Sequence, residues 1–450
     1  MNDMKQLAAD VVERATRAGA DAVEVYLRRG VETEVSIRNG AIETLQQGQP
    51  KSVGIRLWVG ERSASTYATD DRPAALDELI RGTLDLVKLT DPVPELAIAD
   101  AARMAQSVPN LDLFDAAVAE VPADRKIALA REAEEAGRSA DSRITVSGGA
   151  SYSDLALEHA LANSHGLCVG YKESFASFGV SLIADDAEGK KRNGSWSTYG
   201  RFAASLESPQ LVGETAARRA VRQLGAAPVP TQKLPVVFDS IPAGSLVGLL
   251  FSVLTGGAVE RRSSFLADLL GQMVVGENVT LEDNPLLLRG PGSKPYDGEG
   301  APTAPTTFID AGRLTSFALN SYSARKLGMS PTGHASRPSS GSPGETAFNL
   351  SMRPGTVDAE QLIAETAHGF FCEGMMGFGF NAATGDFSRG AFGRIIEGGK
   401  LGAPVSEVTL SINLRDLFSS IDLLGNDIDR RRSVAAPSFR IREATLAGRG

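Results

Sequence analysis

An alternation of apolar and polar residues with a period of two restricts the fold of this chain more strongly than any other feature. It is found at residues 22–27, 32–37, 42–45, 53–59 and 63–68, and again over much of 142–185. This period predicts β-strands, the first two joined at Arg29-Gly30, and Asn39-Gly40 is a hairpin turn signal. Helices are predicted near residues 3–18, 72–88, 123–139 and 208–224. The first half should therefore be an α/β domain with antiparallel strands and flanking helices.

A stretch rich in alanine and proline at residues 225–231 divides the chain into two halves. The 450 residues are too many for one comfortable core. We therefore place a domain boundary here, with an N-terminal domain at residues 1–226 and a C-terminal domain at 232–450. The second half contains a strand at 234–238, an apolar helix near 242–255, a further helix near 357–367, and short strand–turn–strand units around 307–313 and 394–400. This half is predicted to be β-rich with inserted helices, which makes the whole chain α+β.

Charge and composition exclude several classes of protein. The formal net charge is −9 and the isoelectric point is about 5.2, so the chain repels nucleic-acid phosphates and no direct nucleic-acid binding is expected. No apolar run is long enough to span a membrane, and Met1 to Arg17 lack the apolar core of a signal peptide. We therefore expect a cytoplasmic protein without membrane contact.

The usual hydrolase motifs are missing from the sequence. Four histidines are present, but they do not form the His-Glu-x-x-His pattern that places two imidazoles on one helix. No Gly-x-Ser-x-Gly elbow occurs. Cys372 follows two phenylalanines and precedes a glutamate, and both kinds of neighbour raise the pKa of a thiol. A self-sufficient metal site built from His159, His165 and either Glu158 or His334 stays open as an alternative.

Two polar segments could contact a substrate. Asn381, Asp386 and Arg389 lie on what is predicted to be a loop and the start of a strand, where they could form a peptide-binding rim. Arg325 lies in a mildly basic segment and could hold a carboxylate through a bidentate contact. His334 follows shortly after it. Turn chemistry, or a structural aspartate as the partner of Arg325, would explain the same residues equally well.

Several short motifs follow one another in a fixed order along the chain. In the second half they are Asp297-Gly298-Glu299-Gly300-Ala301-Pro302-Thr303, residues 320–329, Thr332-Gly333-His334-Ala335, residues 381–390 and Asn413-Leu414-Arg415-Asp416-Leu417. In the first half, Ala18-Gly19-Ala20-Asp21 precedes Asn39-Gly40 and Gly54-Ile55-Arg56. This order resembles the TldD–PmbA family, and within it the PmbA branch, also called TldE. The resemblance covers nearly the whole chain.

The resemblance implies a heterodimeric zinc peptidase that cleaves unfolded or extended peptides inside an enclosed cavity. In the TldD branch a His-Glu-x-x-x-His metal motif lies on the first helix of the C-terminal half. The equivalent helix here runs through residues 245–252, and the metal positions fall near Val247, Gly248 and Ser252. None of these residues ligates zinc as histidine does, and a glycine cannot act as a general base. We therefore expect no metal and no catalytic residue in this chain, and zinc in a TldD-type partner.

Three functions follow as hypotheses. The chain could be the metal-free subunit that completes the chamber and holds an unfolded peptide, with Arg325, His334, Asn381, Asp386 and Arg389 as the candidate substrate contacts. It could instead be a self-sufficient peptidase, or a non-enzymatic regulator that acts on DNA gyrase, a toxin–antitoxin system or another client. The first hypothesis predicts a heterodimer with a TldD-type subunit. A homodimer in the absence of that partner stays open.

Overall fold

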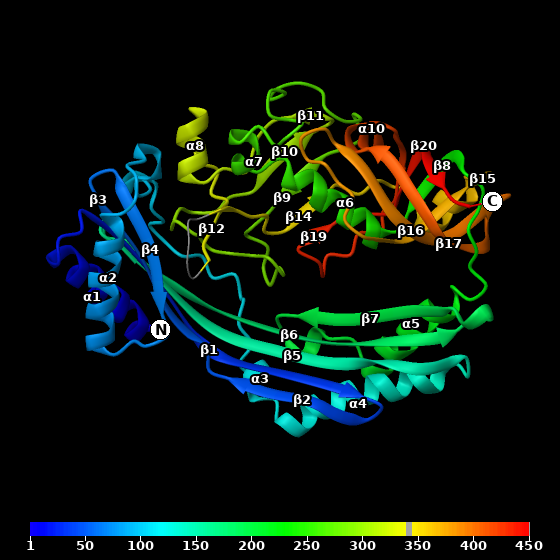
Figure 1. Ribbon diagram of the computed structural model, residues 1–450, viewed down its shortest axis with the longest axis horizontal. Coiled ribbons are helices and arrows are strands. Elements are labelled where there is room, and N and C mark those ends of the chain that lie inside the picture. The colour runs from blue at the N-terminus through cyan, green and yellow to red at the C-terminus, as the bar shows by residue number, and fades with distance from the viewer. Residues whose placement is uncertain (339–343, 450) are drawn as a thin grey trace.

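The computed structural model describes residues 1–338 and 344–449, and the first 200 residues contain one long, curved antiparallel sheet (Figure 1). Its seven strands follow the order β4-β3-β1-β5-β6-β7, and β2 pairs with the second half of β1. The strands are β1 (Ala22–Arg38), β2 (Ala41–Gly48), β3 (Lys51–Val59), β4 (Arg62–Ala68), β5 (Ile144–Asn163), β6 (Cys168–Asp185) and β7 (Lys191–Gly200). The antiparallel strands predicted for the first half are confirmed.

One expected strand break is absent. β1 runs through Arg29-Gly30 without interruption, so the prediction of two strands joined there is wrong. Gly30 is needed because β5 approaches closely: a Cβ at this position would lie 2.1 Å from the carbonyl oxygen of Ala156. β5 likewise runs without interruption from Ile144 to Asn163, with two register shifts near its start. Glycine in these strands marks close packing, not a strand end.

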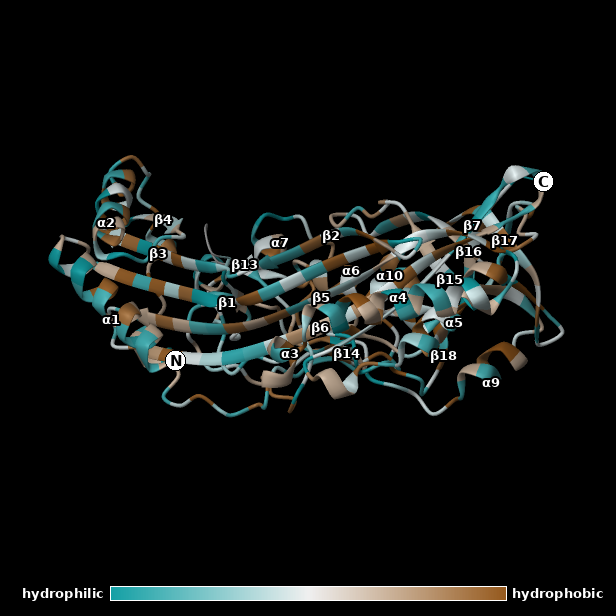
Figure 2. Ribbon diagram, turned by 90° about the horizontal axis from the view of Figure 1, so that it is seen from below, coloured by the Kyte–Doolittle hydropathy of each residue, from teal (hydrophilic) through white to brown (hydrophobic). Residues whose placement is uncertain are grey.

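Helices cover one face of the sheet, which we call the outer face. Two share a core with Val23, Val25 and Leu27 at one end of the sheet, and three share a core with Val35 and Ile37 at the other. The helices of this half are α1 (Asn2–Arg17), α2 (Pro73–Val87), α3 (Ala116–Glu120), α4 (Ala123–Ala140) and α5 (Pro209–Val221). Successive side chains of a strand point to opposite faces, so the even-numbered positions of β1 form the inner face. Figure 2 shows this alternation as coloured bands along the long strands.

The second half is built around a sheet that closes on itself. Its strands follow the order β17-β16-β15-β8-β20-β18, and β17 also pairs with β20, which completes the ring. β8 and β15 are parallel neighbours, whereas the other pairs are antiparallel. The strands are β8 (Gln232–Phe238), β15 (His368–Met376), β16 (Asp386–Glu397), β17 (Lys400–Asn413), β18 (Ile421–Leu424) and β20 (Phe439–Ala447).

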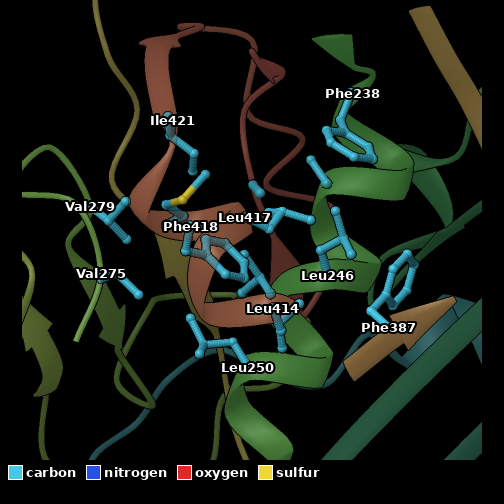
Figure 3. Close-up of a cluster of buried hydrophobic side chains, with 14 of the residues drawn as sticks. Phe238, Leu246, Leu250, Val275, Val279, Phe387, Leu414, Leu417, Phe418 and Ile421 are labelled. Atoms are coloured by element: carbon cyan, nitrogen blue, oxygen red, sulfur yellow. The ribbon is translucent and has the colours of Figure 1, made fainter. Parts of the chain in front are cut away.

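Short helices and a small mixed sheet pack against this ring. The helices are α6 (Ser240–Ser252), α7 (Gly256–Glu260), α8 (Ser321–Leu327), α9 (Ala359–Ala364) and α10 (Leu414–Ser419). The small sheet contains β11 (Arg313–Leu314), β10 (Thr306–Asp310), β9 (Leu281–Asp283), β14 (Leu350–Met352) and β19 (Val434–Ala435), and β12 (Ala335–Ser336) pairs with β13 (Gly344–Glu345). Leu246 and Leu250 of α6 enter one core with Leu417 and Phe418 of α10 (Figure 3). Each such burial contributes roughly 1.5–3 kcal/mol. This β-rich half with inserted helices confirms the α+β class.

The C-terminal half lies over the inner face of the large sheet (Figure 1). At one end, the backbone N–H of Ala105 donates to the carbonyl of Gly300 over 2.9 Å. At the other end, Arg192 of β7 donates to the hydroxyl of Ser406 in β17 over 2.9 Å. Contacts at both ends hold the two halves together and leave their facing surfaces to form a cleft. No helix among the residues that the structure describes is long and apolar enough to cross a membrane.

Candidate functional site

The inner face of the large sheet carries a row of aromatic and charged side chains that crosses three strands. Register pairs Arg28 of β1 with His159 of β5, and His159 with Tyr171 of β6. The ring of His159 stacks on Tyr171 with centroids 4.7 Å apart, and Tyr26 stacks on it from the other side at 5.9 Å. Arg28, His159 and Tyr171 share a face because they are paired directly across neighbouring strands, and Tyr26 joins them because it lies two residues before Arg28 on β1.

A hydrogen-bond chain links this row to two cations, Arg201 after β7 and Lys294 on the C-terminal half. The hydroxyl of Tyr26 lies 2.7 Å from Nδ1 of His159, and Nε2 of His159 lies 2.9 Å from Oε1 of Glu173. Glu173 also contacts Lys294 at 3.3 Å and Arg201 at 3.2 Å. Arg201 is fixed further, because it donates to the carbonyls of Gly290 and Pro291. The chain therefore ends on a carboxylate held between two cations.

Burial and charge decide where the protons of this chain lie. Burial, aided by Glu173, raises the pKa of Tyr26, so its hydroxyl stays protonated. Burial lowers the pKa of His159 despite its carboxylate neighbour, so the imidazole is neutral at pH 7. Burial alone would raise the pKa of Glu173, but Lys294, His159 and Arg201 together hold it well below 4.5. Tyr26 then donates to Nδ1, and Nε2–H of His159 donates to Glu173. Both imidazole nitrogens are occupied, so His159 is unsuited to bind metal or act as a base.

Two adjoining cavities open between the inner face and the C-terminal half, and we call them together the cleft. The smaller has a volume of about 250 Å³ and is lined in part by Lys294 and Tyr296. The larger has about 410 Å³ and is lined in part by Arg28 and Arg201. Both include Tyr26 and Arg337 in their walls. Arg337 makes a 2.5 Å ion pair with buried Glu24 of β1, so this pair separates the two spaces and joins the halves.

Arg325 contributes to the contact between the halves. It lies on α8, which starts at a capping box formed by Asn320 and Ser323. Its guanidinium donates to the carbonyls of Ala97 and Ile98 over 2.6 and 2.8 Å. The guanidinium also forms an ion pair with Asp100 at 3.3 Å. Most of its donors are therefore used in holding the segment that follows α2.

His334 is fully buried in the C-terminal half and is not among the residues that line the cleft. Its Nδ1 lies 3.0 Å from the carbonyl of Thr332, and its Nε2 lies 3.4 Å from Oδ2 of Asp283. Phe308 and Phe348 pack on the ring. A side chain enclosed in this way supports the local packing and has no exposed surface to offer a substrate.

Asn381, Asp386 and Arg389 lie together on the turn and strand that follow β15. Asn381 and Asp386 are exposed, and their side chains accept hydrogen bonds within the turn, from the N–H of Ala383 and the hydroxyl of Thr384 respectively. Arg389 of β16 stacks over Phe387, and among the described residues its Nε has no hydrogen-bond partner. The structure brings these three residues together but places Arg325 and His334 elsewhere.

The helix predicted to correspond to the zinc helix of TldD does not suit a metal. Val247 of α6 is fully buried in the core. The side of α6 turned away from the core presents Ser245, Gly248 and Ser252, which share a face through their spacing of three and four. This face offers no imidazole, thiolate or carboxylate, which are the side chains that bind zinc. Within the described ranges, no group of three or more His, Cys, Asp or Glu side chains is arranged to hold a metal.

The residues of the alternative metal site do not converge. Glu158 and His159 are neighbours on β5 and point to opposite faces of the sheet. Glu158 forms ion pairs with Lys172 and with the N-terminal amine, the latter at 3.3 Å. His165 lies in the exposed turn after β5, where Nδ1 is 3.1 Å from the carbonyl of Ala99. Cys372 is fully buried, and burial raises the pKa of its thiol. A raised pKa was predicted from the residues beside it in the sequence.

Sequence reasoning missed the residues that line the cleft. Tyr26, Glu173, Arg201 and Lys294 come from three strands or strand ends and one loop, and only the pairing of those strands brings them together. The alternation of β6 does place Tyr171 and Glu173 on one face, so this part of the site could have been found. The partners of that face could not, because the order of strands in a sheet is not written in a single sequence.

Comparison with known proteins agrees with this architecture over nearly the whole chain. Models of the PmbA/TldA metallopeptidase family match in three parts: domain 1 at residues 23–105, the central domain at 117–224 and the C-terminal domain at 231–448. The chain is 35% identical over 429 residues to metalloprotease PmbA of Escherichia coli O157:H7, covering 95% of this chain and 93% of that one. It is 31% identical over 447 residues to a PmbA homolog of Haemophilus influenzae, covering 99% and 96%.

Solved structures show the same fold. A candidate modulator of DNA gyrase from Bacteroides thetaiotaomicron superposes with a TM-score of 0.93 at 27% identity, covering all of both chains. TldE from Thermococcus kodakarensis superposes with a TM-score of 0.86 over 98% of this chain and 100% of that one, and at 19% identity this likeness concerns the fold alone. The chain belongs to the PmbA/TldD metallopeptidase family, and the resemblance recognised in its sequence is confirmed.

Proposed function

We propose that this chain is the metal-free, PmbA-type subunit of a heterodimeric zinc peptidase whose zinc and general base belong to a TldD-type partner. The observation that carries the proposal is the face of α6 that lies away from the core, where serine and glycine stand in place of metal ligands. Membership of a metallopeptidase family supports peptide hydrolysis as the activity of the whole assembly. The dispersed histidines of this chain support the assignment of catalysis to the other subunit.

The role of this chain in the assembly would be to wall the chamber and hold an unfolded or extended peptide. The cleft supports this role because it combines flat aromatic side chains with fixed charges. Tyr26, Tyr171 and Tyr296 offer apolar surface with a polar end, which suits contact with many different side chains. A peptide held in extended form can also be bound through its backbone, independently of sequence. Asn381, Asp386 and Arg389 remain candidate contacts on the exposed turn after β15.

Cleavage of an unfolded peptide tests the proposal. This chain, a TldD-type protein from the same genome and an equimolar mixture of the two are each incubated with a quenched fluorescent peptide. We expect cleavage in the mixture, little in either protein alone, loss of activity with a zinc chelator and recovery with added zinc. Cleavage by this chain alone that survives the chelator would overturn the proposal. Absence of cleavage in the mixture, with zinc bound to the partner, would favour a non-enzymatic regulator.

A further inference from the structure

The larger cavity of the cleft contains a guanidinium whose charge is not neutralised. Arg28 lies on the inner face of β1, opposite His159. Its Nε is buried and has no hydrogen-bond partner among the described residues. The carboxylates of Glu24 and Glu173 are used elsewhere, because Glu24 pairs with Arg337 and Glu173 pairs with Lys294 and Arg201. Arg28 therefore has donors to offer a ligand.

The charges around this cavity leave an excess of positive charge. The cavity is lined by the cations Arg28, Arg201 and Arg337 and by the carboxylate of Glu173, and Arg337 is neutralised by Glu24. His159 adds no charge at neutral pH, because its imidazole is neutral. At least one positive charge is thus uncompensated in a partly buried space, which is unfavourable until an anion enters. An anion beside Arg28 would restore the balance.

The remaining wall of the cavity is apolar. Leu155 and Leu157 of β5, Phe175 of β6 and Pro291 of the C-terminal half line it. An inorganic phosphate would leave this surface without a partner, whereas a carboxylate that carries an apolar group would cover it. The volume of about 410 Å³ falls within the range of small-ligand sites, which is about 300–1,000 Å³. The C-terminal residue of a peptide with an apolar side chain has both features.

We infer that this cavity binds a carboxylate attached to an apolar group, as at the C-terminal end of a peptide, and that Arg28 holds the carboxylate. A guanidinium suits this ligand because its planar donors match the two oxygens of a carboxylate. Binding itself needs only this chain. The further conclusion, that the cleft holds the C-terminal end of a peptide substrate, rests on the proposed function.

Calorimetric titration of the intact chain tests the inference. The probes are acetyl-Ala-Ala-Phe with a free carboxylate and the same peptide as its C-terminal amide. We expect the acid to bind at least tenfold more tightly, since a charge-assisted hydrogen bond is worth about one power of ten in affinity. Equal affinity for the two peptides, or no binding of the acid at millimolar concentration, would overturn the inference. This comparison does not depend on any variant.

Two variants of neighbouring arginines locate the contact. Arg28→Gln should weaken binding of the acid about tenfold and leave the amide unchanged. Arg29→Gln is the matched control, because Arg29 is exposed and forms ion pairs with Asp3 and Glu158 on the outer face. Its affinity for the acid should equal that of the unaltered chain. Full retention of binding by Arg28→Gln, with unchanged melting temperature, would contradict the assignment of Arg28.

A third probe separates the two sources of such a carboxylate. Acetyl-phenylalanine should bind more weakly than the tripeptide acid if the cavity receives a peptide terminus, and equally well if it receives a small carboxylic acid. Either result agrees with a carboxylate site in this cavity. Because these titrations use the chain alone, a failure of cleavage in the mixture with its partner would count against the proposed function without affecting them.

Discussion

Glu173 shows how one residue stabilises the contact between the two halves. It accepts a hydrogen bond from His159 and pairs with Lys294 and Arg201, which are fixed by the C-terminal half. Its side chain is only 14% exposed, so removal of its charge leaves two cations without a counter-charge in a poorly solvated place. The single residue thus affects the packing of both halves.

Replacement of this carboxylate should make stability depend less on pH. Because Lys294, His159 and Arg201 hold the pKa of Glu173 well below 4.5 against the effect of burial, its contribution is complete above pH 4.5 and is lost as the pH falls below that value. Glu173→Gln should therefore cost roughly 3 kcal/mol of unfolding free energy at pH 7. The difference from the unaltered chain should shrink on acidification, as measured by urea unfolding at several pH values.

Glu158→Gln provides the control for this measurement. Glu158 lies on the neighbouring strand and faces the outer side, where it pairs with Lys172 and the N-terminal amine. Surface pairs of this kind contribute about 1 kcal/mol or less. A loss at Glu173 no larger than that at Glu158, or one that stays constant down to low pH, would contradict the role assigned to Glu173.

At the scale of elements, glycine decides how closely helices and strands approach. α4 and α5 cross where Gly213 faces Gly137, and a Cβ at Gly213 would lie 2.4 Å from the carbonyl of Ala133. In α2, by contrast, Gly82 is exposed and a Cβ there would meet nothing within 4 Å. The same substitution at the two positions should therefore have opposite effects.

Gly213→Ala should destabilise the chain by about 1–3 kcal/mol, because the added methyl group forces α4 and α5 apart. Gly82→Ala should stabilise it by about 0.5–1 kcal/mol, because alanine loses less conformational freedom in a helix. Denaturant unfolding of both variants measures the two changes on one scale. A neutral result at Gly213 would mean that the helix crossing adjusts without strain.

The sequence was most informative about elements. The period of two correctly predicts most strands of the large sheet, although β7 lies outside the predicted segments. The helices at residues 2–17 and 73–87 lie where they were expected. Strand ends were less predictable, as the continuity of β1 through Gly30 shows. Whether a glycine ends a strand or permits close packing depends on what lies beside it. For Gly30 that neighbour is Ala156, which is distant in the sequence.

At the scale of the whole molecule, pattern alone could not supply the arrangement of the elements. β8 pairs with β15 and β20, so the closed sheet depends on strands that lie far apart in the sequence of the C-terminal half. The cleft likewise depends on a loop of the C-terminal half reaching the inner face of β5 and β6. Only the ordered motifs that resemble the family carried information on this scale.

The zinc content of the purified chain, alone and in complex with a TldD-type partner, tests the central claim most directly. Elemental analysis combined with light scattering gives the number of zinc ions per chain and the mass of each species. The account predicts no stoichiometric zinc in the chain alone and one zinc ion for each pair of unlike chains. One zinc ion per chain in the isolated protein, lost on His165→Ala, would contradict the account. It would favour the hypothesis that this chain has a metal site of its own.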